Sequence, residues 1–375
     1  MPTTDSINDK KVATKEAETQ QQQQNGSAEQ EQMMTQQHPI QSGIPPWHSM
    51  AFIAALVAIA APFLPSAEDL DEFSSVETWT HRKFPDLVSL RTLAGIRLGT
   101  AFVTLGLTFY LACISPGWDV NPNYKAHSKL RPEHVRLQGI GTLCPFTSWC
   151  WMILGVGFLT RGVVALAACL VEDGDDEKGL ELLGNNIIDK AALERYVLQN
   201  KLLLRITLVL WEMTGPLATL VSCVVKYGIW PQVLRCGKPH LLANFRNQLQ
   251  HNCNSIFSLL EVTMLGGVPI AFSHLSMATV LGAVYILFTW FMATAYFGNK
   301  KVGPQYIYWF MDTTLEQTTT MALAALASTL TVFYALFSFL IHAVLGGASS
   351  ESAPSLTTNV LFLIVGSYCV CRFKD

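Results

Sequence analysis

Long apolar runs recur along this sequence, and they constrain its fold more than any other feature. Half of the 375 residues are hydrophobic and only 14% are charged. A soluble domain of this size does not need so many apolar residues to fill its core, so we expect the excess to face lipid. A bilayer core of about 30 Å takes about 20 helical residues to cross, and most of the runs reach that length. The eight runs lie at positions 49–64, 98–115, 147–170, 206–225, 254–272, 276–297, 319–345 and 357–371.

These runs predict an all-α protein, a polytopic transmembrane helix bundle with about eight spans. The first run is short and could also act as a signal-like segment, although it lies far from Met1 behind a polar tail. That tail contains an unbroken glutamine run and almost no aromatic residues, so we expect it to be disordered. We divide the chain into a disordered Gln-rich tail (1–46), an extra first span with a polar connector (47–94), a transmembrane helical core (95–345) and a last short span with a tail (346–375).

The distribution of charge predicts the orientation of the bundle. If all eight runs cross the membrane, the side that holds both termini collects most of the Lys and Arg residues. The positive-inside rule then places both termini in the cytoplasm. Residues 180–200 carry apolar and charged positions at helical spacing, which is typical of a helix on the membrane surface or of a solvated connector.

Composition also limits the partners. A net charge of −3, with no basic helical face, argues against nucleic acid, so the expected partners are membrane lipids. The nine cysteines form no CxxC pair and have no His companions at zinc-binding spacing, so we expect no metal and no cofactor. The sequence does not specify the oligomeric state or the membrane.

Three ionisable residues stand inside the apolar runs: Arg161, Glu212 and Glu261. A charged group within a span costs about 2.5 to 3.5 kcal/mol on insertion scales, so such groups are paired, hydrated or functional. With a rise of about 1.5 Å per residue, Arg161 and Glu212 reach the same depth from opposite ends of consecutive runs. We therefore predict an intramembrane ion pair between them, whose first role is to fix the register of the helices.

A hydroxyl and an imidazole are expected at one depth of the membrane. Thr147 opens the third run and His251 stands just before the fifth, and in the eight-span topology both runs begin on the same side. An imidazole within reach of a hydroxyl can take its proton as the oxygen attacks an ester. Asn254 is then a possible oxyanion donor and Glu261 a possible orienting residue. The alternative roles are structural, with Thr147 as a helix cap and His251 binding a headgroup or a carbonyl.

Several short blocks resemble the motifs of one eukaryotic family of multi-pass membrane proteins. FTSWCW at 146–151, followed by GF at 157–158, resembles the LTFWNW…YF signature of the androgen-induced protein family. HNCN at 251–254 with LLE at 259–261 is similar to that family's HxxN…LLxD block. Further similar blocks are LWEM at 210–213, YILFTW at 285–290 and YWFMD at 308–312. The blocks follow the family order over about 95–345.

The resemblance implies threonine hydrolase chemistry on fatty acid esters of hydroxy fatty acids. The family's Thr and His match Thr147 and His251 of this chain. Trp309 and Cys150 depart from the family pattern, because they replace a proline and a polar residue. Our leading hypothesis is therefore an enzyme, a membrane-embedded lipid ester hydrolase with a Thr nucleophile and a His general base.

The runner-up hypothesis is a non-enzymatic multi-pass membrane protein, either a transporter or a scaffold. In that protein Arg161, Glu212 and Glu261 would line a polar path through the bundle. A one-sided pocket that ends at Thr147 and His251 would favour the enzyme instead.

Overall fold

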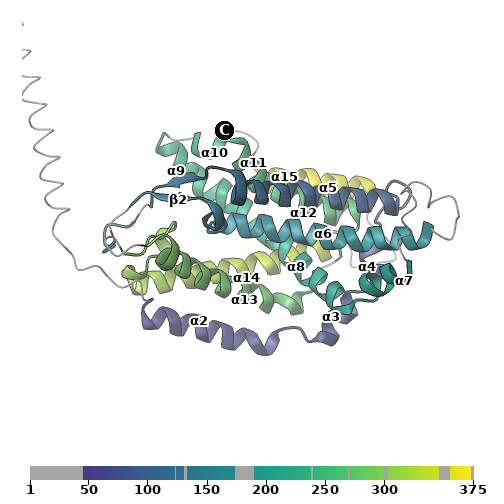
Figure 1. The fold of residues 1–375 in the computed structure, drawn as a ribbon, viewed down its shortest axis with the longest axis horizontal. Helices are drawn as coiled ribbons and strands as arrows, with labels where there is room; N and C mark the ends of the chain where they lie inside the picture. The colour runs from purple at the N-terminus through teal and green to yellow at the C-terminus, as the bar shows by residue number, and fades with distance from the viewer. Residues whose placement is uncertain are drawn as a thin grey trace, which may run out of the picture. The chain divides into compact units, whose positions relative to one another are not determined.

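The fold is a bundle of apolar helices, described here from a computed structural model of the chain (Figure 1). Residues from Gly43 onward form one compact unit, and the predicted tail lies almost entirely outside the described residues. Within the described part, two short strands are the only extended elements that pair: β1 (Trp118–Val120) and β2 (Val135–Leu137). The structure describes residues 45–122, 124–130, 133–173, 190–237, 240–268, 270–298, 303–345 and 355–372.

Five helical segments of the described chain are long and apolar enough to cross a membrane, which confirms the all-α, polytopic fold class. These segments are Leu90–Ile114, Phe146–Glu172, Lys201–Arg235, Phe272–Tyr296 and Gln317–His342. The helices at their centres are α5 (Leu90–Phe109), α6 (Phe146–Asp173), α8 (Lys201–Cys223), α13 (Leu275–Phe291) and α14 (Gln317–Leu345).

The other three predicted runs differ from simple spans. In the first, α2 (Trp47–Ala60) continues through η1 (Ala61–Phe63) and meets α3 (Ala67–Phe73) at a bend of 64°, so the pair counts as a sixth span at most. The last run forms α15 (Leu356–Val370), which has only 15 residues. The structure therefore supports five or six long spans in the described chain, where we expected about eight.

The fifth predicted run is the clearest departure. A continuous helical segment over 245–265 is built from α11 (Phe245–Gln248), η7 (Leu249–Cys253), α12 (Asn254–Leu260) and η8 (Glu261–Leu265). It ends seven positions before the predicted end at 272, because Gly266 has a φ of 148° and leaves the helix. The segment is not among the span candidates, since its polar residues lower its hydropathy. We call it the 245–265 helix.

Side-chain caps explain where several helices begin. Ser89 accepts a hydrogen bond from Thr92 N at the start of α5, and Asn200 accepts one from Leu203 N at the start of α8. At α3 the Ser66 side chain and the backbone form a reciprocal capping box. The shorter helices are η2 (Tyr110–Ile114), α4 (Val76–Thr80), η3 (Gly139–Leu143), α7 (Lys190–Leu193), η5 (Glu194–Leu198), η6 (Val224–Ile229), α9 (Trp230–Arg235), α10 (His240–Ala243), η9 (Phe272–His274), η10 (Met292–Tyr296), η11 (Trp309–Met311) and η12 (Thr313–Leu315).

The predicted surface helix at 180–200 is described only in part. Positions 180–189 lie outside the described residues, and the chain from 190 to 198 is helical, as α7 and η5. This helical stretch packs against α6 and leads into α8.

Glycines bring α5 and α6 into close contact. A Cβ at Gly155 would lie 2.7 Å from Thr104 Oγ1, and a Cβ at Gly162 would lie 2.8 Å from a methyl carbon of Leu98. Small residues at such positions let the backbones of membrane helices approach each other. The two helices therefore form one rigid pair, which run side by side in Figure 1.

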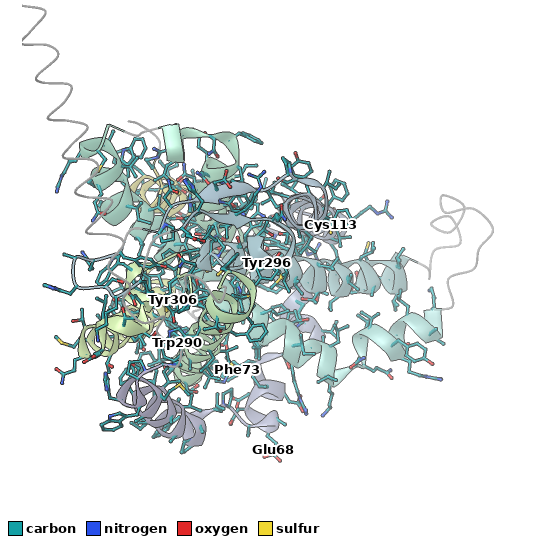
Figure 2. The ribbon with its side chains drawn as sticks, turned by 60° about the vertical axis from the view of Figure 1, so that its left-hand side comes forward. Glu68, Phe73, Cys113, Trp290, Tyr296 and Tyr306 are labelled. Carbon is teal, nitrogen blue, oxygen red and sulfur yellow. The ribbon has the colours of Figure 1, made fainter. Side chains whose placement is uncertain are left out.

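One end of the bundle carries the β1–β2 hairpin, and we call it the hairpin end. The Arg246 guanidinium stacks 3.8 Å above the Trp118 ring, which brings the start of the 245–265 helix to the hairpin. Tyr296, labelled in Figure 2, donates a hydrogen bond to the Gln138 carbonyl, so the end of α13 also lies there. At the opposite end Asp71 pairs with Arg205, next to the start of α8. Helices that begin at one end therefore finish at the other.

The residues after α15 fasten onto the 245–265 helix, in a contact that we call the Asn252 clamp. Asn252 Nδ2 donates to the Arg372 carbonyl over 2.7 Å, and Arg372 N donates to Asn252 Oδ1 over 3.0 Å. The Arg372 guanidinium also stacks 3.7 Å from the Trp230 ring and donates to the Leu242 carbonyl. The clamp thus holds α9, α10 and the 245–265 helix together.

The first apolar helix belongs to the same bundle as the predicted core. Ser49 of α2 shares a 2.7 Å hydrogen bond with Thr320 of α14. Ile53 of α2 is buried in one hydrophobic cluster with Trp290 and Tyr306, which are both labelled in Figure 2. Since Thr320 starts α14, the described chain begins and ends at the hairpin end.

Candidate active site

The start of α6 is fixed by two tyrosines, and it carries Thr147. Tyr285 donates a 2.9 Å hydrogen bond to the Cys144 carbonyl, and Phe146 N donates to the Tyr308 hydroxyl over 3.3 Å. Thr147 follows at once and is half-buried. No hydrogen bond of its hydroxyl is found among the described residues, so this oxygen is not committed to a structural partner.

His251 lies in η7, directly before Asn252, whose side chain forms the clamp. Its carbonyl accepts a hydrogen bond from the Ser222 hydroxyl of α8. Within the described part of the chain, its ring Nδ1 is buried and has no hydrogen-bond partner. Burial, with the positive charges of Arg246 and Arg372 nearby, lowers the pKa of His251 to about 4. The imidazole is therefore neutral at pH 7, which is the form that can accept a proton.

Thr147 and His251 share one end of the bundle but are not hydrogen-bonded. The Trp151 ring of α6 packs in one cluster with Leu249 and Cys253, and deeper in the bundle Arg161 meets Glu261, so the two helices run parallel. Thr147 stands one turn before Trp151 and lies on the same face of α6. His251 lies about half a turn away from Leu249 and Cys253, and no hydrogen bond joins it to Thr147 in the described structure.

Asn254, the predicted oxyanion donor, is fully buried. Neither Nδ2 nor Oδ1 of its amide has a hydrogen-bond partner among the described groups. Its backbone carbonyl accepts a 3.1 Å bond from Ser258, so only the side chain is unsatisfied. A buried amide without partners costs about 1–3 kcal/mol, which is a reason to expect a ligand or water there.

The predicted ion pair between Arg161 and Glu212 is wrong. Arg161 Nη1 lies 3.3 Å from Glu261 Oε1, and Arg161 Nε donates to the Gly157 carbonyl over 2.9 Å. Counting residues along α6 and α8 placed Arg161 and Glu212 at the right depth. It did not give the direction in which each side chain points around its helix axis. The ring of Trp211 faces the Arg161 guanidinium at 4.3 Å, so Glu212, the next residue of α8, points about 100° away.

Glu261 instead forms ion pairs with two arginines. Arg97 Nη2 donates to Glu261 Oε1 over 2.5 Å, and Arg97 Nε lies 3.1 Å from the same oxygen. Arg97 also donates to the Trp79 carbonyl. All three charged side chains are buried, and the Phe158 ring covers a face of the Arg161 guanidinium at 4.4 Å. Glu261, expected as a possible orienting residue for polar groups, orients arginines.

Glu212 belongs to a second buried pair. Its Oε2 lies 2.7 Å from His274 Nδ1, and its Oε1 accepts a 3.0 Å hydrogen bond from Ala271 N. The carboxylate thereby holds the chain that leads into α13. Arg161, Glu212 and Glu261 thus divide between two separate groups of partners, each tying helices together.

Sequence reasoning missed Arg97 and His274. Arg97 stands one position before the apolar run at 98–115, whereas the helix begins at Leu90, and the Ser89 cap is the signal that could have shown this. His274 lies in the one-turn helix η9 between two apolar segments, where no local pattern distinguishes it from a surface residue. No group of three or more His, Cys, Asp or Glu residues in the described ranges is arranged to hold a metal.

Comparison of the chain with protein-family models, with curated proteins and with solved structures finds no match. The likeness of its sequence blocks to the androgen-induced protein family therefore stays a prediction from motifs.

Proposed function

We propose that this chain is an integral membrane lipid ester hydrolase with Thr147 as nucleophile and His251 as general base. One observation carries the proposal: among the described residues, the ring Nδ1 of His251 and both side-chain amide atoms of Asn254 are buried without hydrogen-bond partners, in the first half of a helix parallel to α6. Unpaired polar atoms are expensive in a membrane bundle, so a retained set of them favours a substrate-binding role. The motif resemblance supports the same two residues.

The proposed reaction has two halves. His251 takes the proton of Thr147 as its oxygen forms a bond to the acyl carbon, and the Asn254 amide donates to the oxyanion that develops. The acyl–alkoxy bond then breaks, and the proton returns from His251 to the leaving alcohol. Water, deprotonated by the same imidazole, hydrolyses the acyl-threonine and releases a carboxylic acid.

No hydrogen bond joins the Thr147 hydroxyl and the His251 ring in the described structure, so substrate binding has to bring the two groups together. Catalytic hydrogen bonds are often long or misaligned in the absence of substrate. His251 also lies in the π-helical turn η7, and such turns occur frequently at functional sites. The imidazole lies about half a turn from the face that packs on α6, so the proposed reaction requires this turn to rotate when substrate binds.

The engagement of both buried carboxylates favours this proposal over a transporter. Glu261 is engaged by Arg97 and Arg161, and Glu212 is engaged by His274 and Ala271 N. Charges that are paired with each other hold helices in register, whereas a conducting path needs polar groups that are free to meet a substrate.

The test uses the purified full chain in detergent with a long-chain ester of a hydroxy fatty acid. Thr147→Ala and His251→Ala should each reduce kcat/KM about 10²- to 10⁴-fold. Thr160→Ala is the matched control, because it removes a half-buried hydroxyl of the same helix that only binds the Gly157 carbonyl. A fluorophosphonate probe should modify Thr147, as located by mass spectrometry. Full activity in either of the first two variants refutes the proposal.

We also propose that the hairpin end faces the cytoplasm. The Lys and Arg residues of its loops support this orientation through the positive-inside rule. A glycosylation site added after Arg372 should remain unmodified in microsomal membranes. Modification of that site would reverse the orientation and leave the hydrolase proposal untouched.

A further inference from the structure

A hollow opens at the hairpin end, outside the candidate active site. Its volume is about 510 Å³, within the range of ordinary small-molecule sites. Two chain segments form its walls, the loop around 125–127 and the stretch that leads from η11 into α14. The polar and aromatic side chains of the lining are Lys125, His127, Trp309, Thr314, Glu316 and Thr318.

A buried carboxylate holds these two walls together. Asp312 is fully buried, and its Oδ2 accepts a 2.5 Å hydrogen bond from Ser128 of the first wall. Its Oδ1 accepts bonds from Thr314 N and Oγ1 of the second wall, at 2.9 and 2.7 Å. Lys129 N in turn donates to Thr314 Oγ1 over 3.0 Å. The hollow is therefore built into the fold and does not depend on flexible side chains.

The backbone at Glu316 is strained. Its φ of 51° makes it the one residue other than glycine with a positive φ in the described chain. Such a conformation costs of order 1–3 kcal/mol and is found most often at ligand clamps and active sites. The Glu316 carboxylate lies beside the hollow, where its one ionic partner among the described residues is the exposed Lys129 at 3.4 Å. An exposed pair of this kind is weak, so a ligand can replace it.

The lining presents opposite charges to a ligand. Lys125 Nζ lies 4.4 Å from the centroid of the Trp309 ring, so the face of this ring attracts a cation. When a ligand cation takes that face, Lys125 becomes free to bind an anion together with His127. Glu316 supplies the negative charge next to the ring. A zwitterion with a phosphate and a quaternary ammonium matches this arrangement.

The hollow continues into the lipid-facing side of α14. Thr318 lines the hollow, and Met321 stands one turn further along α14 with 73% of its surface exposed. Val332, Leu336 and Phe339 continue the same face and are 58, 52 and 66% exposed. Because α14 is a span candidate, this apolar stripe faces acyl chains. A ligand of the hollow can therefore be a lipid with its headgroup at the hairpin end.

We infer that the hollow binds the headgroup of a zwitterionic phospholipid, with phosphate at Lys125 and His127 and choline between Trp309 and Glu316. The acyl chains follow the stripe that begins at Met321. This inference does not depend on the proposed hydrolase activity, since none of these residues belongs to the candidate active site.

The test is native mass spectrometry of the delipidated full chain, titrated with dioleoyl phosphatidylcholine. Lys125→Ala and Trp309→Ala should each weaken retention of the lipid about five- to tenfold, as loss of a cation–π partner or a charge contact predicts. Trp309→Phe should keep most of the binding. Arg136→Ala is the matched control, because Arg136 is an exposed cation of the same end that pairs with Asp119 and does not line the hollow.

Three comparisons decide the result. Equal retention of phosphatidylcholine by wild type and Lys125→Ala overturns the inference, and Lys125 is exposed, so this variant folds. Equal or tighter binding of dioleoyl phosphatidylglycerol overturns the zwitterionic assignment. Phosphocholine competing as well as the intact lipid shows a soluble ligand site and overturns the part played by the α14 stripe.

Discussion

The two halves of the 245–265 helix treat their polar residues in opposite ways. In the second half, Glu261 is fully buried and shares its carboxylate between Arg97 and Arg161. In the first half, Asn254 is buried as completely, yet neither of its amide atoms has a partner among the described residues, and the same holds for Nδ1 of His251. One helix thus contains both a satisfied and an unsatisfied polar group at a similar level of burial.

This difference separates a structural role from a functional one. A charge that is paired on several sides locks helices into register, and its removal leaves the partners stranded. A buried amide without hydrogen-bond partners does not stabilise the fold. Such a group is tolerated where a ligand or a reaction requires it. We therefore assign Glu261 to the framework and the His251–Asn254 turn to the site.

Removal of Glu261 should produce the largest effect. Glu261→Ala leaves the Arg97 and Arg161 guanidinium groups buried without their shared anion, which costs about 3–5 kcal/mol. Thermal unfolding in detergent should show a lower midpoint and a poor yield of monodisperse protein. Glu316→Ala, which breaks an exposed pair, serves as control and should change stability by less than about 1 kcal/mol. If Glu261→Ala leaves the thermal unfolding midpoint unchanged, Glu261 does not hold the helices in register.

Acid should reveal the burial of His251. Its folded pKa of about 4 lies below the ordinary 6.5, so the unfolded chain binds a proton that the folded chain does not. Between these two values the free energy of unfolding should therefore fall by about 1.4 kcal/mol per unit decrease in pH. Unfolding midpoints measured across this window should fall less steeply in His251→Gln. Parallel curves for the two proteins would mean that the imidazole titrates as in water.

Replacement of Asn254 should separate stability from activity. Asn254→Leu removes an unsatisfied amide at nearly constant volume, so stability should rise by about 1–3 kcal/mol. Ester hydrolysis should fall about 10²-fold if the amide stabilises the oxyanion. Unfolding midpoints and kcat/KM are measured on the same preparation. A loss of stability would show that the amide is satisfied in the protein and would end the contrast between the two halves of the helix.

The smallest effect is expected at Ser222. Its hydroxyl donates to the His251 carbonyl and accepts a 2.7 Å bond from Ser255. Ser222→Ala should cost about 1 kcal/mol, because the Ser255 hydroxyl can turn its one proton to the Ala218 carbonyl, 2.9 Å away. The unfolding midpoint gives the stability change, and a change in KM without a change in kcat would mean that Ser222 acts on substrate binding alone.

Long helices could be predicted from the sequence because hydropathy is a local property. The centres of α6, α8, α13 and α14 all fall within predicted runs. The span number was overestimated where a run contained polar residues, as at Asn254 and Glu261, since a run of moderate hydropathy also fits a short helix. The end at Gly266 depends on a backbone conformation that residue types alone do not determine.

The sequence predicted the depth at which the site residues lie in the bundle. It did not predict the direction in which their side chains point around the helix axes. Counting residues placed Arg161 and Glu212 at one level, and both are buried, but the partner of Arg161 is set by the angle at which α6 and α8 pack. The same limit applies to Thr147 and His251, which share the hairpin end while their hydrogen bond stays a prediction. Such angles depend on close contacts like those at Gly155 and Gly162, which no single helix specifies.

The Asn252 clamp has a consequence for biogenesis. Asn252 and Arg372 are 120 positions apart, so the ribosome must synthesise all of that chain, including α13, α14 and α15, before the clamp can form. Until then Trp230 also lacks its stacked guanidinium. The turn that carries His251 is therefore completed late, after α15 has been synthesised.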